Sequence, residues 1–208
     1  HNIPIVEDAC QAILAEYKGK RTGTFGSMAG YSLHPLKNLN VWGDAGVIAT
    51  DSDAHYHTLR LLRNHGMKNR DEIEIFGYNS RLDTIQAAIL SEKLKIFADE
   101  IQLRNKVADR YAEGLKDHVL AVPGTPDNVV SVWAQYVIDH ENRDGLQAHL
   151  KAQGVPSAVY YPVPMHVNGA YERFRSGAGN LTVTEDKMGK VLALPMHPYL
   201  NESDQDKV

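Results

Sequence analysis

A lysine in the segment Ser32-Leu-His-Pro-Leu-Lys-Asn, residues 32–38, has the surroundings that a covalently acting lysine needs. Lys37 follows Pro35 by two residues and has no helical pattern around it, so we expect it in a loop. A lysine that attacks a carbonyl must be largely desolvated, so that its amine is neutral often enough to react. Apolar neighbours favour such a shielded loop: Leu33, Leu36, Leu39, Val41 and Trp42. The alternative is a solvated surface charge, the more frequent role of lysine.

A carboxylate follows a short apolar run near the start of the chain. Residues 3–6 are rich in β-branched side chains and predict a buried strand of a parallel sheet, with Asp8 just beyond it. Ligands of open α/β sheets bind at that end of the strands, and a carboxylate there needs a cation or several donors. Two interpretations stay open. Asp8 and Gln11 are the N-cap and N3 residues of a helix, or Asp8 faces a protonated heterocyclic nitrogen.

Two further polar groups suit an anion. Ser32, at an expected strand end, can donate its hydroxyl to a phosphate oxygen, or it is an ordinary strand-end serine. Asn79 and Arg81 stand at the expected entrance of a helix, where free N–H groups attract anions. The alternative is a capped surface helix, in which Ser80 and Asp83 form a capping box and Arg81 makes an ion pair.

The ten histidines do not form a metal-binding pattern. His55 and His57 are closely spaced, but no third ligand lies near them, and zinc sites need three or four convergent ligands. We therefore predict no metal. The sequence also has no glycine-rich phosphate motif of the Walker or dinucleotide type.

The composition of the 208 residues is that of an ordinary globular protein, with 43% hydrophobic and 23% charged residues. The formal net charge of −4 gives no electrostatic reason to expect nucleic acid or an anionic membrane as a partner. The sequence contains no apolar run of about 18 residues, so it predicts no membrane span. A single cysteine, Cys10, favours a reducing cytoplasmic location. The chain opens in a strand-like run without an initiator Met, so we expect it to begin inside a larger protein.

The elements that must position these residues alternate between strand and helix patterns. The strongest signal is an apolar stripe of about 3.6 residues from Arg81 to about Lys116, which predicts one long helix. Proline and glycine at 122–128 indicate a linker. Other expected strands are 29–33, 46–50, 129–137 and 158–161, and other expected helices are 54–63, 143–153, one from near Thr184, and one beginning within 201–208.

Ordered blocks across nearly the whole chain resemble the DegT/DnrJ/StrS family of sugar aminotransferases. The blocks are Ile5-Val-Glu-Asp-Ala-Cys-Gln-Ala, Gly23-Thr-Phe-Gly-Ser, Tyr31-Ser-Leu-His-Pro-Leu-Lys-Asn-Leu, Trp42-Gly-Asp-Ala-Gly-Val-Ile-Ala-Thr, Leu62-Arg-Asn-His-Gly, Gly77-Tyr-Asn-Ser-Arg-Leu-Asp-Thr-Ile-Gln-Ala-Ala and Leu194-Pro-Met-His-Pro-Tyr-Leu. The resemblance implies an α/β chain of the fold-type I PLP-transferase architecture. Residues 1–121 would be the C-terminal part of the large, mostly parallel-sheet domain, and 122–208 a small α+β domain.

The resemblance also implies a cofactor, pyridoxal 5'-phosphate (PLP), and a role for each matching residue. Lys37 matches the lysine that holds PLP as a Schiff base. Asp8 matches the partner of the pyridine nitrogen, Gln11 the side chain beside the ring oxygen, and Ser32 a phosphate contact. Asn79 matches a phosphate contact supplied by the partner subunit, which implies a homodimer with shared active sites.

The implied reaction moves an amino group from an amino acid, with glutamate as the expected donor, to a nucleotide-linked keto-sugar. Such chemistry serves surface polysaccharide, including lipopolysaccharide, or secondary-metabolite sugar synthesis. We expect His34, Tyr161 and His166 near the sugar, and a structural role for the Tyr160–His166 segment is the alternative. Two rival functions remain. The first is a PLP-dependent sugar dehydratase: such enzymes resemble this family but have His where Lys37 stands, so Lys37 argues against it. The second is a non-catalytic or sensory protein, which stays open because the chain lacks the N-terminal part that family members carry.

Overall fold

The computed structural model describes residues 1–177 and 179–208, which form two compact units. The first unit contains residues 1–101 and 126–134, and the second contains residues 102–125 and 135–208. The chain therefore passes between the units more than once, and one passage falls inside a helix rather than at residue 121. The predicted domain boundary at 121 stays a prediction about the whole protein.

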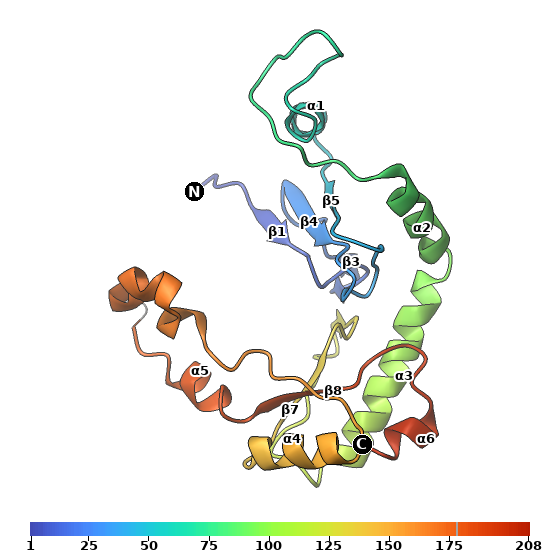
Figure 1. The fold of residues 1–208 in the computed structure, drawn as a ribbon, viewed down its shortest axis with the longest axis vertical. Coiled ribbons are helices and arrows are strands. Elements are labelled where there is room, and N and C mark those ends of the chain that lie inside the picture. Colours follow the sequence, from blue (N-terminus) through green and yellow to red (C-terminus); the bar gives the residue numbers. More distant parts are fainter. Residues whose placement is uncertain (178) are drawn as a thin grey trace. The chain divides into compact units, whose positions relative to one another are not determined.

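The first unit is built on a three-stranded sheet in the order β1-β4-β5 (Figure 1). Strand β1 (Val6–Asp8) is parallel to β4 (Met28–Ser32), and β4 is antiparallel to β5 (Gly46–Ala49). Strands β4 and β5 lie close to where the sequence predicts them. The first strand covers Val6–Asp8 instead of 3–6, and the prediction that it is buried is wrong: its residues are exposed or half-buried, because in the described sheet it is an edge strand that pairs with β4 alone. One of the two pairings is parallel, so this part of the sheet is mixed.

A second small sheet joins β3 (Lys20–Arg21), β2 (Glu16–Tyr17) and β6 (Val129–Val130), all antiparallel. The segment 9–15 between the two sheets consists of turns, held by i→i+3 bonds such as Ala12 N–H to the Ala9 carbonyl at 3.0 Å. The interpretation of Asp8 as a helix N-cap is therefore wrong. Tertiary packing decides this segment, because Ile13, Leu14 and Ala15 contact the hydrophobic core.

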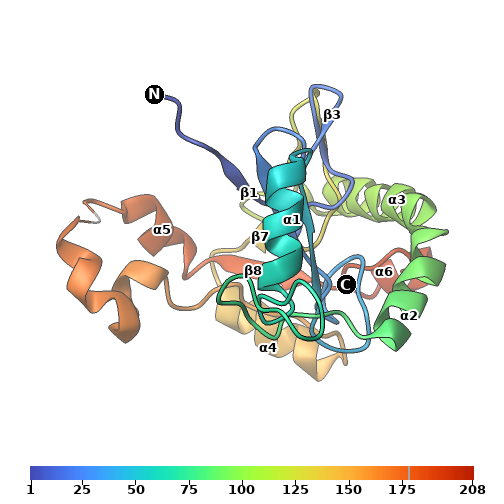
Figure 2. The same ribbon diagram turned by 90° about the horizontal axis from the view of Figure 1, so that it is seen from above.

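The long helix predicted from Arg81 to Lys116 is two helices, α2 (Thr84–Leu94) and α3 (Phe97–Leu115) (Figure 2). Tight i→i+3 bonds at residues 95 and 96 separate them, and Phe97 begins α3 almost fully buried. The predicted capping box is also wrong, because Asp83 is the N-cap residue of α2 and its side chain makes no cap bond. The separate helix α1 (Asp53–Leu62) agrees with the sequence, and its N-cap Ser52 accepts a bond from His55 N–H.

The core of the first unit lies under the loop that carries Lys37. Six buried side chains form it: Leu33, Leu39, Val41, Phe97, Ile101 and Val132. Each such side chain contributes roughly 1.5–3 kcal/mol by leaving water. Three of the six flank Lys37 in sequence, so the loop is fixed from below by apolar anchors although it has no regular secondary structure.

The second unit is a small α+β unit around the antiparallel pair β7 (Tyr136–Asp139) and β8 (Val191–Leu194). Tyr136 and Leu192 are fully buried on these strands. The remaining elements are α4 (Arg143–Ala152), α5 (Thr182–Lys187), α6 (Glu202–Gln205) and the 3₁₀ segments η1 (Met165–Val167) and η2 (Gly169–Gly177).

Two strand predictions in this part of the chain need correction. The expected strand 129–137 is divided between β6 and β7, which belong to different sheets. The expected strand 158–161 is reduced to a single bridge between Ala158 and Ala193. Among the described residues, no helix combines the length and apolarity that crossing a membrane requires.

Candidate functional site

The parallel pairing of β1 and β4 brings the two predicted chemical segments to one edge of the sheet. Asp8, the last residue of β1, is in register with Gly30 of β4, and Ala9 N–H donates to the Gly30 carbonyl at 3.0 Å. Ser32 ends β4 two residues later, and the Lys37 loop follows it. Because parallel strands end at the same edge, Asp8, Ser32 and the Lys37 loop are neighbours through backbone topology alone.

Asp8 is an exposed carboxylate with hydrogen-bonding capacity left over. Its Oδ1 accepts a bond from Cys10 N–H at 3.2 Å. Hydrogen bonds from the Cys10 thiol and N–H, together with the positive charge of Lys37, hold the pKa of Asp8 below its ordinary value. The carboxylate is therefore ionised at neutral pH, and its remaining lone pairs can accept a further donor.

Lys37 is half-buried, and its ammonium has no hydrogen bond or ion pair within the described ranges. Its backbone N–H donates to the His34 carbonyl at 2.8 Å, which closes a turn. The apolar neighbours divide into two groups: Leu33, Leu39 and Val41 are buried beneath the loop, whereas Leu36 and Trp42 are exposed. The amine is thus close to Asp8 in electrostatic terms but not consumed by a salt bridge.

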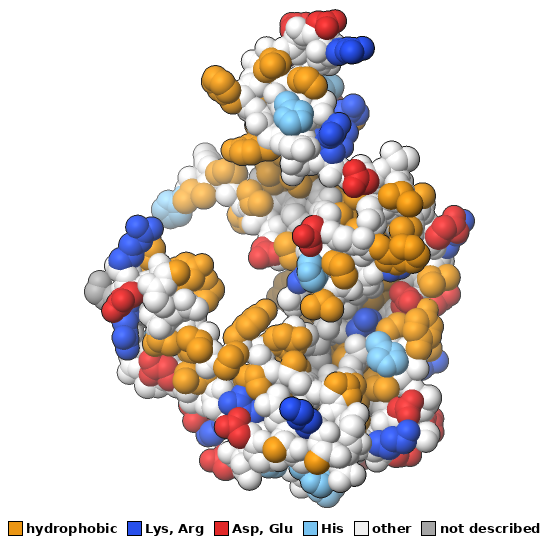
Figure 3. All heavy atoms as spheres, viewed as in Figure 1, with side chains coloured by type: hydrophobic (Ala, Val, Ile, Leu, Met, Phe, Trp, Pro, Cys, Tyr) orange, Lys and Arg blue, Asp and Glu red, His pale blue; other side chains and the backbone are white. Residues whose placement is uncertain are grey.

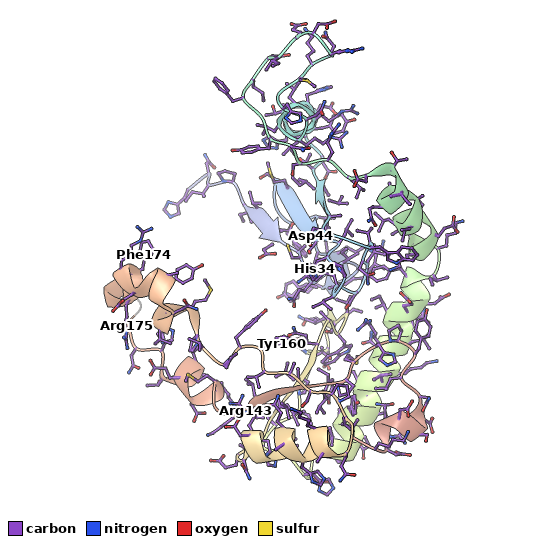
Figure 4. All side chains as sticks on the ribbon, in the orientation of Figure 1. His34, Asp44, Arg143, Tyr160, Phe174 and Arg175 are labelled. Atoms are coloured by element: carbon purple, nitrogen blue, oxygen red, sulfur yellow. The ribbon has the colours of Figure 1, made fainter. Side chains whose placement is uncertain are left out.

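Ser32 and His34 are linked to each other across the strand end. Ser32 Oγ accepts a bond from His34 N–H at 3.3 Å, which leaves the hydroxyl hydrogen free to donate elsewhere. The His34 ring is exposed: Nδ1 accepts a bond from Leu36 N–H at 3.1 Å, and Nε2 lies 3.9 Å from Asp44 Oδ1. Figure 4 shows His34 and Asp44 close together, in the segment between the end of β4 and the start of β5.

Gln11 and Asn79 occupy different surroundings. Gln11 is exposed in the turn that follows Asp8. Asn79 lies between α1 and α2 and lines a cavity of about 810 Å³ together with Cys10, Arg60 and Arg81. Asp8, Ser32 and Lys37 do not line this cavity. The structure therefore brings Asp8, Ser32 and Lys37 to one strand edge and places Asn79 at a neighbouring hollow of the same unit.

Hydrophobic side chains are exposed on the loop that carries Asn79. Figure 3 shows them on the surface of α1 and the loop after it, at the top of the view. Among them are Ile73, Phe76 and Tyr78, and the Phe76 side chain is completely exposed. Several large apolar side chains exposed on one loop are typical of a protein contact.

The family model of the DegT/DnrJ/EryC1/StrS aminotransferases matches residues 1–208, the whole chain. The chain belongs to this family. It is 43% identical over 203 residues to the UDP-2-acetamido-2-deoxy-3-oxo-D-glucuronate aminotransferase of Pseudomonas aeruginosa, which covers 97% of this chain and 55% of that protein. It is 40% identical over 211 residues to a pleiotropic regulatory protein of Geobacillus stearothermophilus, covering all of this chain and 57% of the relative. The chain thus spans about half the length of the curated relatives it matches.

Solved structures of the DegT/DnrJ/EryC1/StrS family agree with the mixed α/β fold. A family aminotransferase from Brucella abortus superposes with a TM-score of 0.92 at 44% identity, over 98% of this chain and 55% of that one. A Bacillus subtilis relative solved with bound cofactor PMP gives a TM-score of 0.84 at 30% identity, over 99% of this chain and 48% of that one. These matches confirm the resemblance inferred from the sequence blocks, and the family uses PLP.

The strand-edge residues fit the cofactor of the DegT/DnrJ/EryC1/StrS family. PLP requires a primary amine, an anionic partner for its pyridine nitrogen and donors for its phosphate. Lys37 offers an amine and Asp8 an ionised carboxylate with spare lone pairs, and Ser32 offers a hydroxyl hydrogen; within residues 1–177 and 179–208 the amine has no ion-pair partner and the hydroxyl hydrogen no acceptor. No group of three or more His, Cys, Asp or Glu side chains converges as a metal site within the described residues.

Tyr161 and His166 belong to the second unit, and their predicted sugar contacts stay a prediction. Tyr161 is exposed, and its ring packs edge-on against Tyr160 with 5.5 Å between centroids. His166 is nearly buried, and its Nε2 lies 3.1 Å from Glu185 Oε1, which ties η1 to α5. His166 therefore has a structural contact, whatever else it does.

Three residues beside the site were not singled out from the sequence. Glu7 accepts backbone bonds from Gly23, Phe25 and Gly26 at 2.6 Å each. Asn40 and Gln86 hold the Lys37 loop through their side-chain amides. A signal for Glu7 exists in the sequence, because an acidic residue on a strand and a glycine-rich turn are natural partners. The bond of Asn40 to the Lys37 carbonyl spans only three residues. The Lys93 partner of Asn40 and the Trp42 partner of Gln86 are remote in sequence, and no local pattern identifies them.

Proposed function

We propose that the protein is a PLP-dependent aminotransferase that moves an amino group from an amino acid to a nucleotide-linked keto-sugar. The observation that carries this proposal is the placement of Asp8 and the Lys37 loop at one edge of two parallel strands, close enough for the charge of Lys37 to lower the pKa of Asp8, in a chain of this family. Glutamate is the donor we propose, and surface polysaccharide or secondary-metabolite sugar synthesis is the setting. The substrate class is supported by the relatives, which include a protein named as an aminotransferase of a UDP-linked oxo-sugar acid.

Each strand-edge residue has a distinct task in this proposal. When bound, PLP supplies an electron sink for the bonds around the amino acid's α-carbon. Lys37 would hold the cofactor covalently, and its amine, when free, would move a proton as general acid–base. Asp8 stays ionised and holds a proton on the pyridine nitrogen. Ser32 donates its hydroxyl to the phosphate, and Gln11 flanks the ring oxygen.

We further propose that the protein is a homodimer located in the cytoplasm, with Asn79 completing the partner's phosphate site. The exposed apolar side chains on the loop before Asn79 support a second copy as the partner, since such a surface is costly in water. His34 is proposed as a sugar contact because its exposed ring stands beside Ser32 at the strand edge. Tyr161 and His166 are proposed as further sugar contacts from the second unit.

A regulatory protein is the second candidate function. A 40% identical relative is named a pleiotropic regulatory protein, so membership of the family does not by itself establish turnover. The dehydratase alternative is weaker. PLP-dependent sugar dehydratases resemble this family but have His at the position where this chain has Lys37.

The experiment that separates the two candidates is covalent trapping of the cofactor. The full-length protein is mixed with PLP, reduced with borohydride and digested for peptide mass mapping. We expect a visible absorbance band before reduction and a pyridoxyl adduct on Lys37 after it. In Lys37→Ala both should vanish while the circular dichroism spectrum is unchanged, because the side chain holds no structural bond. An adduct on another lysine, or none in the wild type, would favour the regulatory candidate.

A further inference from the structure

The loop that carries Lys37 is held by side-chain amides as well as by its apolar anchors. Residues 33–45 contain no helix or strand, yet two strand-like bonds close them: Leu33 N–H to the Ala45 carbonyl and Val41 N–H to the Leu33 carbonyl. A loop that lacks the regular hydrogen bonds of a helix or sheet needs other partners for its backbone N–H and C=O groups. In this loop, amide side chains supply them.

Gln86 of α2 and Asn38 make the two outer anchors. Gln86 accepts a bond from Trp42 N–H at 2.8 Å and donates to the Trp42 carbonyl at 2.7 Å, so one side chain replaces a neighbouring strand. Asn38 donates to the Val132 carbonyl at 2.6 Å, which ties the loop to the segment 126–134. Both bonds fix the loop at residues other than Lys37 itself.

Asn40 makes the anchor that acts on Lys37 directly. Its Nδ2 donates to the Lys37 carbonyl at 2.7 Å, and its Oδ1 accepts from the ammonium of Lys93 on α2. Both the NH₂ group and the oxygen of the Asn40 amide are therefore hydrogen-bonded. Since the lysine side chain projects from a backbone whose carbonyl is held, the direction of its first bonds depends on this contact.

We propose that Asn40, oriented by Lys93, is a positioning residue for Lys37. Asn40 does not touch the reacting atoms. It fixes the carbonyl of the turn and so limits the volume that the Lys37 amine can search. The inference rests on the proposed function, because only a lysine that must meet one cofactor atom gains from being held in this way.

The test exploits the two chemical ends of the amide. Asn40→Asp keeps the shape and the bond to Lys93 but replaces the donor to the Lys37 carbonyl with an oxygen that repels it. Lys93→Met removes the orienting cation and leaves the donor. Asn128→Asp is the control, because Asn128 is exposed in the same unit and the substitution adds the same charge. All variants are made in the full-length protein.

Two measurements are compared across the variants. The first is hydrogen exchange of the peptide covering residues 34–41 in protein freed of cofactor. The second is the rate of pyridoxyl-adduct formation on Lys37 at limiting PLP. For Asn40→Asp we expect roughly tenfold faster exchange and roughly tenfold slower trapping, the effect of one lost hydrogen bond. For Lys93→Met we expect changes in the same direction but smaller. The thermal midpoint should fall by no more than about 4 °C.

The outcomes distinguish the positioning role from the proposed function. If Asn40→Asp matches Asn128→Asp in both measurements, the positioning role is overturned while wild-type trapping still supports the enzyme. If wild type forms no adduct, the proposed function fails, and the exchange comparison alone decides whether Asn40 holds the loop. Should Asn40→Asp not fold, Lys93→Met decides the matter: unchanged exchange at 34–41 would overturn the proposal, and faster exchange confined to that peptide would support it.

Discussion

Two neighbouring carboxylates on β1 serve two different regions of the molecule. Glu7 faces the loop 22–26 and accepts N–H bonds from Gly23, Phe25 and Gly26. Asp8 lies at the strand edge beside the Lys37 loop, with Cys10 as the source of its hydrogen bonds. Successive side chains of a strand point to opposite faces of the sheet, so the adjacent residues Glu7 and Asp8 lie in different surroundings.

The difference lies in how much bonding capacity each carboxylate has left. Burial acts to raise the pKa of Glu7, but the three N–H groups and the charge of Lys20 outweigh it, so that pKa is lowered. The pKa of Asp8 is lowered as well, by Cys10 and Lys37, yet its side chain is exposed. A saturated carboxylate stabilises a loop, whereas an ionised carboxylate with free lone pairs is available to a ligand.

Replacing Asp8 should have the largest effect on function and little effect on the fold. In the proposed function, Asp8→Asn removes the charge that would hold the pyridine proton, and we expect transamination to fall by about a hundredfold or more. The thermal midpoint should stay near that of wild type, because the Asn oxygen can still accept the Cys10 N–H bond. Steady-state kinetics with glutamate and a keto-sugar, next to a melting curve, measure both.

Asp127→Asn is the matched control for Asp8→Asn, since Asp127 is an exposed carboxylate of the same unit. It should change neither activity nor the melting curve. A fully active Asp8→Asn enzyme would remove the functional half of the comparison between Glu7 and Asp8.

Local sequence patterns predicted the elements that carry the site but not the contacts that hold it. The strand β4 and the helix α1 follow from an apolar run and from helical spacing, and they lie close to their expected positions, whereas β1 begins three residues later than expected. The local pattern after Asp8 permits two interpretations, a helix with Asp8 as its N-cap or a loop with Asp8 as a ligand-binding carboxylate. Packing of Ile13 and Leu14 on the core settles it as turns.

Long-range bonds explain most of what the sequence could not show. The break between α2 and α3 depends on Phe97 reaching the core. The anchor between Gln86 and Trp42 joins residues 44 positions apart. The roles of Lys37, Asp8 and Asn79 came from family resemblance, since spacing alone left each of them with a structural alternative.

Replacing Glu7 should have the opposite profile to Asp8, a loss of stability with the chemistry retained. In Glu7→Gln one carboxylate oxygen becomes an NH₂ group that cannot accept the N–H bonds it faces. We expect the free energy of unfolding to fall by about 1–3 kcal/mol at neutral pH. The turn that Glu7 binds also depends on its glycines: a Cβ at Gly23 would lie 1.6 Å from the Tyr31 hydroxyl, and one at Gly26 would lie 2.4 Å from the Ile5 carbonyl oxygen. Denaturant unfolding of both proteins measures the difference.

The stabilisation by Glu7 should also depend on pH, with a defined sign. The folded-state pKa lies below the ordinary value of 4.5, so the native state favours the ionised form. The advantage of wild type over Glu7→Gln is therefore fully present above pH 4.5 and disappears as the pH falls through the folded-state pKa. A difference that grew on acidification would contradict the role assigned to the three N–H bonds.

The smallest expected effect concerns Cys10, which sets the properties of Asp8 without saturating it. Cys10→Ala removes the thiol, which lies 3.8 Å from the Gly30 carbonyl and acts to lower the pKa of Asp8, whereas Cys10→Ser keeps a donor at the same position. We expect the acid limb of the cofactor's visible absorbance to move to higher pH in Cys10→Ala and to stay near wild type in Cys10→Ser. The unfolding free energy should change by less than about 1 kcal/mol in either variant, because the side chain is half-buried and small. If the visible absorbance of Cys10→Ala and of wild type has the same pH dependence, the backbone N–H of Cys10 and the charge of Lys37 are sufficient to keep Asp8 ionised. The thiol then has no effect on Asp8.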